Sequence, residues 1–396
     1  MFSARSTYER HPNPVETLRR RLLQQGLAIT DLTESNPTAV GLRHTGLAHL
    51  QPSLPLTRHY TPHPLGLPTA RAAVAKALQI GGNILKSEQI LLTASTSEAY
   101  AYLFKMLCNS GDEILVPQPS YPLLDQLAQA EGVRLVRYPL RWAGQWQLDI
   151  SDLASRLTNR SRAIVVINPN NPTGSYVRAP ELAALLDFKL PLISDEVFFP
   201  YALSSDKGVG QSLLAVPSAT GGSTPHFVLG GLSKFMALPQ LKCSWCVACG
   251  TGPMVDEALW RLECLADTFL SVNTPVQEAL PRLLDHAQGL QVTIAQRLNT
   301  NLSCLAKACA HPHSALTLRA PEGGWFAVVQ LPNIYTDEQW TLSLLQNAHV
   351  LVQPGYFFDF LESSCIVISL LCDSAVFSQG VEDLSRHIRL ACSRRS

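Results

Sequence analysis

Between residues 68 and 270 the sequence alternates short apolar runs with segments of helical spacing. Runs such as EILVP at 113–117 and RAIVVIN at 162–168 are rich in Val and Ile, and amphipathic stretches lie between them. Strands separated by helices of roughly ten residues predict βαβ units and a mostly parallel sheet. Ligands of such sheets bind outside the carboxyl ends of the strands. Functional residues are therefore expected just after the apolar runs.

The periodicity extends over the whole chain and predicts an α/β fold in two parts. We predict helices over 15–25, 69–78, 97–108, 121–132, 152–157, 179–188 and 255–270, and strands over 89–94, 113–117, 133–140, 162–168, 190–195, 226–231 and 242–249. After residue 279 the order changes to a helix followed by strands at 324–332 and 365–371. These patterns predict a large domain over 56–279, a smaller α+β domain over 280–396, and an N-terminal arm over 1–55 that also contributes to the smaller domain.

Composition excludes several classes of protein. Lys plus Arg and Asp plus Glu both number 31, so the chain has no basic excess of the kind that nucleic-acid binders show. No run of about 18 apolar residues is free of polar breaks, and the first 21 residues contain no apolar stretch typical of a secretory signal. We expect a cytoplasmic protein with neither a nucleic-acid nor a membrane partner.

Three of the ten cysteines have CxxCxxC spacing. Cys243, Cys246 and Cys249 lie in LKCSWCVACG, an apolar run that is typical of a buried strand. Alternation along a strand directs Cys243 and Cys249 to one face and Cys246 to the other, so the three cannot bind one ion. The sequence predicts reduced core cysteines and no metal site.

A polar run follows the predicted strand at 89–94. Ser95, Thr96 and Ser97 open a helix, and Ser95 with Glu98 has the S-x-x-E spacing of a capping box. Amides and hydroxyls at a helix N-terminus also bind anions such as phosphate. The residues alone leave an ordinary cap and a phosphate site both open.

Two further polar side chains lie at predicted strand ends. Asn171 is part of NPNNPTG at 168–174, where two Asn-Pro steps and a glycine force a turn. The turn is either a plain loop or a means of directing the Asn171 amide at a ligand. Asp195 ends an apolar strand, where a buried carboxylate needs a positive partner. A protonated ring nitrogen of a heterocycle is one such partner, and a helix cap or a salt bridge is the alternative.

Lys234 follows the strand at 226–231 in FVLGGLSKFMALP. Burial would lower the pKa of its amine and free it for Schiff-base chemistry, whereas a solvated lysine needs no such role. Tyr121 could stack on a planar ligand or simply pack. Tyr60 precedes the first helix of the large domain and has no obvious partner in its own sheet.

In this order the segments resemble the fold-type I enzymes that depend on pyridoxal 5'-phosphate (PLP), the class I and II aminotransferases in particular. The resemblance covers about residues 31–390 and is most specific at NPNNPTG, Asp195 and the pair Ser233–Lys234. It implies a homodimer with shared active sites, and transfer of an amino group between an amino acid (or related amine) and a keto acid. The runs at 320–332 and 351–358 resemble segments that flank the substrate pocket.

The resemblance also implies a role for each candidate residue. Lys234 would carry the cofactor as a Schiff base and move a proton, and Asp195 would keep the pyridine nitrogen protonated. Asn171 would bond the phenolic oxygen, and Tyr121 would stack on the ring. The phosphate would be bound by Ser95, Thr96, Ser97 and Lys242, and by Tyr60 from the neighbouring subunit.

Three positions near the expected cofactor depart from the family pattern. Lys242 stands where an arginine is usual. A lysine keeps the positive charge but cannot form the bidentate hydrogen bonds of a guanidinium. Gly231 stands where a phosphate-contacting serine is common. Phe198 stands where a tyrosine often donates a hydrogen bond to the phenolic oxygen. Without that donor, the pKa of the Schiff base should be higher. Tyr201 could replace that donor only if the turn brings it back.

The fourth departure concerns the substrate. Val367 stands where an arginine normally binds the α-carboxylate, which a valine cannot do. Another arginine, backbone amides, or a substrate that is not a simple α-amino acid would each resolve the conflict. Arg43, Arg261 and Arg319 are the candidates for the first alternative.

Other activities remain open on the same residues. A β-elimination of a sulfur amino acid would begin with the same chemistry. A transcription regulator with this domain would need a helix-turn-helix, for which the arm before Asp31 is too short. A non-catalytic dimer would have no need of Lys234, Asp195 and Asn171 together.

Overall fold

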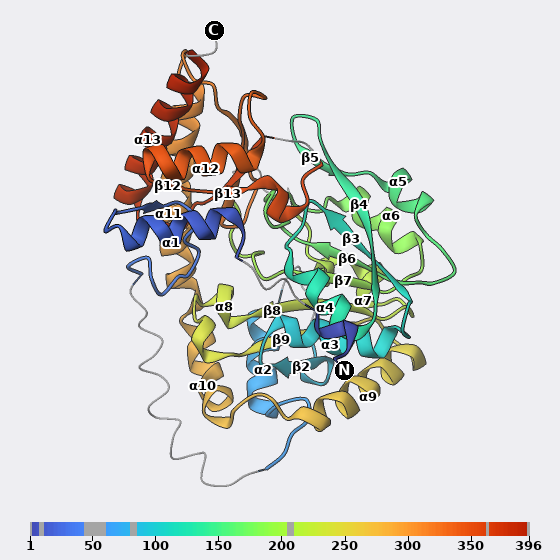
Figure 1. Ribbon diagram of the computed structural model, residues 1–396. Helices are drawn as coiled ribbons and strands as arrows, with labels where there is room; N and C mark the ends of the chain where they lie inside the picture. Colours follow the sequence, from blue (N-terminus) through green and yellow to red (C-terminus); the bar gives the residue numbers. More distant parts are fainter. Residues whose placement is uncertain are drawn as a thin grey trace.

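The computed structural model describes residues 2–7, 12–42, 61–79, 85–203, 210–361 and 364–393. Its main feature is an eight-stranded sheet with the order β2-β9-β8-β7-β6-β3-β4-β5 (Figure 1). The strands are β2 (Ile90–Thr93), β3 (Glu113–Gln118), β4 (Arg134–Trp142), β5 (Trp146–Leu148), β6 (Ser161–Ile167), β7 (Leu192–Asp195), β8 (His226–Gly231) and β9 (Ser244–Cys249). Strands β5 and β9 run antiparallel to the other six strands, which are parallel to one another, so the predicted α/β class with a mostly parallel sheet is confirmed.

Helices cover both faces of this sheet. The helices are α2 (Pro68–Ala77), α3 (Thr96–Leu107), α4 (Leu123–Glu131), α5 (Ile150–Ser155), α6 (Ala179–Asp187), α7 (Pro217–Thr220), α8 (Leu232–Phe235), α9 (Pro253–Phe269) and α10 (Thr274–Asp285). One apolar core joins the sheet to α2, α5, α6 and α10, and a second joins it to α3, α4 and α9. Cys243 and Cys249 belong to the first core and Cys246 to the second, as strand alternation predicts.

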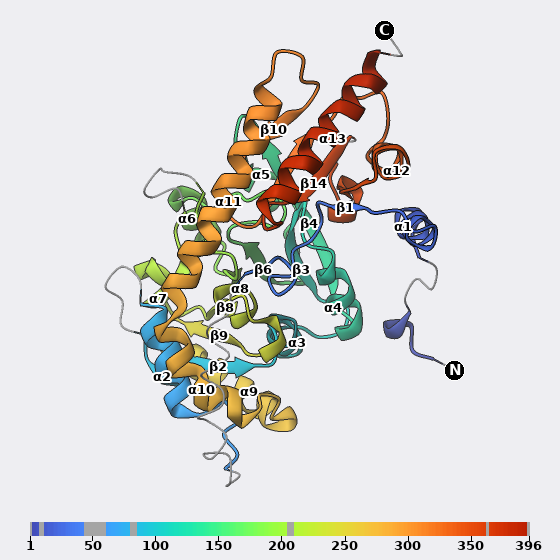
Figure 2. The ribbon, with the colours of Figure 1, turned by 90° about the vertical axis from the view of Figure 1, so that its left-hand side faces the viewer.

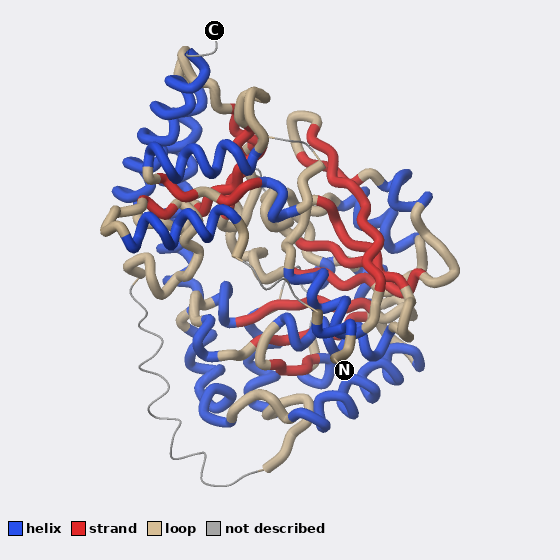
Figure 3. The backbone as a smooth tube through the Cα atoms, viewed as in Figure 1, coloured by secondary structure: helices blue, strands red, loops and turns tan. Residues whose placement is uncertain are grey.

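A smaller antiparallel sheet lies beside the large one, where Figure 3 shows it among helices of the C-terminal part. Its strands are β10 (Thr317–Arg319), β11 (Phe326–Gln330), β14 (Cys365–Ser369) and β13 (Gln353–Pro354), in that order. The long helix α11 (Ala287–Ala310) runs from beside α10 up to α13 (Ser374–Ser393), as Figure 2 shows, and α12 (Asp337–Ala348) completes the layer.

The N-terminal segment packs on this smaller sheet layer. Strand β1 (Thr30–Asp31) pairs parallel with β12 (Val350–Leu351), and α1 (Pro14–Gln24) contacts α12. Leu18 and Leu22 of α1 share a core with Leu345 and Leu351. The predicted boundary at residue 279 lies inside α10. Short 3₁₀ turns complete the structure: η1 (Ala4–Ser6), η4 (Ser87–Gln89), η5 (Leu213–Ala215), η6 (Pro239–Leu241) and η7 (Gly355–Phe358).

The predicted elements agree with the structure to within two or three residues. The clearest difference is the strand predicted over 242–249, which begins at Ser244. Lys242 has a φ of 50°, a left-handed conformation that a strand cannot contain, and its side chain is exposed.

None of the described helices is both long and apolar enough to cross a bilayer. Within the same residues, no group of three or more His, Cys, Asp or Glu side chains is placed to bind a metal ion.

Candidate active site

One cavity brings together the side chains at the carboxyl ends of four adjacent strands. Its lining includes six of the predicted residues: Thr96, Ser97, Tyr121, Asn171, Asp195 and Lys234. Ser35 from the N-terminal segment and Phe326 from β11 also line it, so the cavity lies between the two sheets. This is the position that the rule for parallel sheets predicts.

Lys234 lies in α8, the single helical turn that follows β8. Its Nζ is 4.8 Å from the ring centroid of Trp325 and 5.5 Å from that of Phe198. Burial among these groups lowers the pKa of Lys234 from 10.5 to about 8. A larger fraction of the amine is therefore neutral, and nucleophilic, at physiological pH than for a solvated lysine.

Asp195 ends β7 and opens onto the cavity. Burial raises the pKa of its carboxyl from 3.8 to about 6, against the opposing effect of two hydrogen bonds. Tyr100 donates its hydroxyl to Oδ2 at 3.1 Å, and the Val197 amide donates to Oδ1 at 3.2 Å. Neither partner is positively charged, so a cationic ring nitrogen in the cavity would supply what the carboxylate lacks.

Tyr100 was not among the predicted site residues. It lies in α3, three residues after Ser97 and four after Thr96, and helical spacing places residues at these intervals on one face. That spacing is the signal in the sequence that could have found it.

The loop after β6 uses two of its three asparagines for its own structure. Asn168 accepts from the Val177 amide at 3.0 Å, and Asn170 accepts from the Thr173 hydroxyl at 2.9 Å. Asn171 is 9% exposed, and its Oδ1 has no hydrogen-bond partner among the described residues. A buried oxygen without a partner costs about 1–3 kcal/mol, so Asn171 is the member of the loop that is suited to a ligand.

Of the residues predicted to bind a phosphate, some line the cavity and others do not. Thr96 and Ser97 line the cavity at the first turn of α3. Ser95 is the N-cap, and its hydroxyl accepts from the Glu98 amide at 3.1 Å. Neither Ser95 nor Lys242 is among the lining residues. Tyr60 lies outside the described residues.

Tyr121 follows β3 and faces the cavity with 45% of its surface exposed. Burial of the hydroxyl and the nearby charge of Asp195 both raise the pKa of Tyr121. Its ring thus lies at the wall where a flat ligand held by Asp195 would lie.

Tyr201 does not replace the missing tyrosine at position 198. Its hydroxyl donates to the backbone oxygen of Lys234 at 2.6 Å, and its side chain is fully buried outside the cavity lining. Phe198 packs instead against Trp325, with ring centroids 5.4 Å apart. Trp325 was not predicted individually, although the run at 320–332 was expected to flank the pocket.

No candidate arginine within the described residues lines the cavity. Val367 is fully buried in β14 opposite Val328. Arg319 donates to Gln330 at 2.8 Å and lies over the Trp146 ring, and Arg261 pairs with Glu257 at 2.7 Å on the exposed side of α9. Arg43 lies outside the described residues. Lys234 is the only Lys, Arg or His in the described lining.

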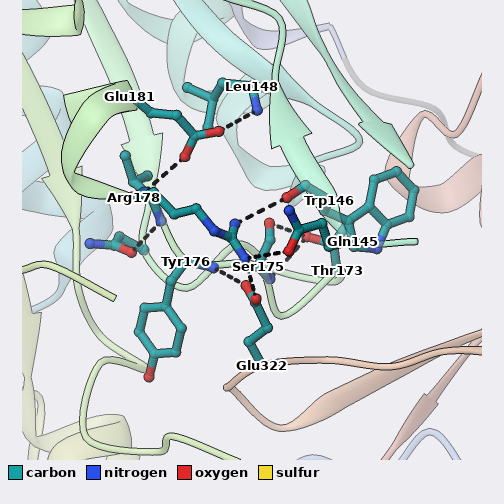
Figure 4. Close-up of polar contacts among 11 residues, drawn as sticks. Gln145, Trp146, Leu148, Thr173, Ser175, Tyr176, Arg178, Glu181 and Glu322 are labelled. Atoms are coloured by element: carbon teal, nitrogen blue, oxygen red, sulfur yellow. Dashed lines mark hydrogen bonds and ion pairs between the residues drawn. The ribbon is translucent and has the colours of Figure 1, made fainter. Parts of the chain in front are cut away.

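An ion pair connects the Asn171 loop to the loop that leads to Trp325. Arg178 donates to Glu322 at 2.5 Å and to Gln145 at 3.0 Å, as Figure 4 shows. The other oxygen of Glu322 accepts from the Tyr176 amide at 3.2 Å. The backbone oxygen of Gly174 accepts from the Glu322 and Gly323 amides, at 3.1 and 2.9 Å. These contacts fix the relative position of two loops that both contribute to the cavity.

Comparison with known proteins gives consistent matches over the length of the chain. The family model described as aminotransferase class I and II matches residues 32–384. An alanine aminotransferase of Mycobacterium tuberculosis is 27% identical over 361 residues, which are 88% of this chain and 82% of the relative. A glutamate-pyruvate aminotransferase of Escherichia coli K12 is 26% identical over 360 residues, covering 88% of this chain and 87% of the relative.

Solved structures have the same fold. A crystal structure of an aminotransferase from Escherichia coli has a TM-score of 0.83 and 25% identity, and the match covers 95% of this chain and 94% of that one. An alanine aminotransferase from Pyrococcus furiosus has a TM-score of 0.84 at 24% identity, with 95% and 96% covered.

Proposed function

Because the chain belongs to the aminotransferase class I and II family, we propose that it transfers an amino group between an amino donor and a keto acid with PLP bound in the cavity at the strand ends. The donor is an amino acid or a related amine. One observation carries the proposal: Lys234, Asp195 and Asn171 line the same cavity. Relatives that are aminotransferases favour amino transfer over β-elimination.

The residues of the cavity suit this cofactor on three counts. The Asp195 carboxyl is half-buried and has no cationic partner, the Asn171 Oδ1 lacks a hydrogen bond, and the Lys234 amine is largely desolvated. A pyridinium nitrogen, a ring hydroxyl that donates to the Asn171 Oδ1, and an aldehyde would satisfy these groups in turn. PLP, when bound, accepts the electrons of a bond broken at the amino-bearing carbon.

The side chains then have separate tasks. Lys234 would hold the cofactor through its amine, and the free amine, with a pKa of about 8, is suited to accept and return a proton near neutral pH. Asp195 would hold the proton on the ring nitrogen, and Tyr100 and the Val197 amide keep the carboxylate in place by hydrogen bonds. Thr96, Ser97 and the free amides at the N-terminus of α3 would bind the phosphate.

We also propose a homodimer that shares its active sites, with Tyr60 reaching the partner's cofactor. Trp260 of α9 is 59% exposed, and we expect the second chain to cover this large apolar side chain. Light scattering on the eluted protein would measure the mass, and a monomer would contradict the dimer. The cytoplasmic location stays a prediction.

The experiment that tests the function is a titration of the purified protein with PLP, followed by visible absorption. We expect a band that bleaches with some members of a panel of amino acids and amines, beginning with alanine and glutamate, and a keto acid that accumulates. Lys234→Ala should abolish both changes. Lys76→Ala, at a lysine whose side chain is 76% exposed, should leave both unchanged. Uptake of no cofactor by the unmodified protein would refute the proposal.

A further inference from the structure

Ser244 occupies a central place at the edge of the sheet that faces the cavity. It is the first residue of β9, the strand between β8 and β2, and it pairs with Gly231 on one side and Thr93 on the other. Gly231 leads directly into α8 with Lys234, and Thr93 leads to the N-terminus of α3. Ser244 thus lies between the two elements that carry the amine and the expected phosphate site.

The hydroxyl of Ser244 is available for a ligand. The residue is 2% exposed and lines the cavity together with Thr96 and Ser97, and its hydroxyl forms no hydrogen bond with the residues that the structure describes. Thr93, its fully buried neighbour in the row, already donates its hydroxyl to the Ser95 oxygen at 3.0 Å. A hydroxyl that lines the cavity and has no protein partner is placed to hydrogen-bond a polar group that enters the cavity.

The space around Ser244 explains why residue 231 has no side chain. A Cβ placed on Gly231 would lie 2.3 Å from the Ser244 Oγ and 2.9 Å from its Cβ. Both contacts are too close for real atoms, so the two positions share one space and only one can carry a side chain. The chain has the glycine at 231 and the hydroxyl at 244.

The surroundings of the hydroxyl favour an anionic ligand. Thr96 and Ser97 belong to the first turn of α3, a helix of 12 residues whose free amides and dipole attract negative charge. Lys242, two residues before Ser244, is exposed and outside the lining. No carboxylate lies beside Ser244 in its strand row, which consists of Thr93, Ser244 and Gly231.

We propose that Ser244 donates its hydroxyl to the phosphate of the bound cofactor, in place of a side chain at residue 231. The inference rests on the proposed function, because it assumes that PLP is the ligand. It adds a phosphate-binding residue from β9 to those that the strand ends and α3 provide.

The test compares the affinity of the apo protein for PLP with that for pyridoxal, which lacks the phosphate. Ser244→Ala should weaken PLP binding about 10-fold or more, as expected for loss of a hydrogen bond to a charged group, and leave pyridoxal binding unchanged. Ser161→Ala is the matched control, since Ser161 is also the first residue of a strand and is 6% exposed. The control should change neither affinity.

A swap variant separates loss of the hydroxyl from damage to the strand. Gly231→Ser alone should weaken PLP binding through crowding with Ser244. Gly231→Ser combined with Ser244→Gly should recover most of the affinity, because the hydroxyl returns to the same space. If Ser244→Ala has the same ratio of PLP to pyridoxal affinity as the unmodified protein, the inference is wrong while the function stands. If the unmodified protein binds neither compound, the proposed function itself fails.

Discussion

Asp195→Asn should make the cofactor-free protein more stable at neutral pH, although it removes a residue that the function needs. The pKa of Asp195 is raised from 3.8 to about 6 by burial, so the carboxyl is protonated in the folded chain and charged in the unfolded chain between these values. Stability from this group is complete below pH 4 and is lost as the pH rises through 6. The difference between the folded and unfolded pKa of Asp195 corresponds to about 3 kcal/mol in the free energy of unfolding. Water in the cavity screens the charge and reduces this value to about 1–3 kcal/mol.

Urea unfolding of the Asp195→Asn variant and of the unmodified protein, both without cofactor, would measure their free energies of unfolding at intervals from pH 4.5 to 8. The two free energies of unfolding should nearly coincide at the acid end, and the variant should exceed the unmodified protein by about 1–3 kcal/mol above pH 7. With PLP present the order should reverse, because a ligand that binds only the folded state stabilises it. A difference that is independent of pH, or a variant less stable at pH 7.5, would refute the reasoning.

Three further predictions follow from neighbouring contacts. In the cofactor-free protein, acetylation of Lys234 should be half-maximal near pH 8, and a profile equal to that of exposed Lys76 would contradict the burial argument. Trp325→Ala should lower the free energy of unfolding in urea by about 3–5 kcal/mol and shift the acetylation profile of Lys234 toward 10.5, whereas Val292→Ala, at a position 50% exposed, should change it by less than about 0.5 kcal/mol. Glu322→Gln should lower the free energy of unfolding by about 1–3 kcal/mol, because it leaves Arg178 without its charge partner. Glu257→Gln, in the exposed pair with Arg261, is the control. An equally small effect of both substitutions would show that the Arg178–Glu322 ion pair does not hold the loops.

Local sequence patterns were sufficient to predict the fold and to single out three residues that line one cavity. The alternation of apolar runs and helical spacing predicted the sheet, since each strand and helix is encoded within its own segment. Asn171, Asp195 and Lys234 could be predicted together because parallel strands end at one edge, whatever their order in the sheet.

The remaining contacts depend on register and tertiary packing, which a single sequence does not reveal. The contact between Tyr100 and Asp195 joins residues 95 positions apart, and the ring of Trp325 reaches Lys234 from the loop before β11. The position of Ser244 beside Gly231 depends on the pairing of β8 with β9. Lys242 was expected at the phosphate, but a left-handed backbone and an exposed side chain separate it from the described lining.

The central claim is that the amine of Lys234 binds the cofactor, and reductive trapping tests it most directly. The protein would be incubated with PLP, reduced with borohydride, digested and sequenced by mass spectrometry. The account predicts one phosphopyridoxyl group per chain, on Lys234, and none after Lys234→Ala. A label that is spread over exposed lysines, or a main label on any other residue, would contradict it.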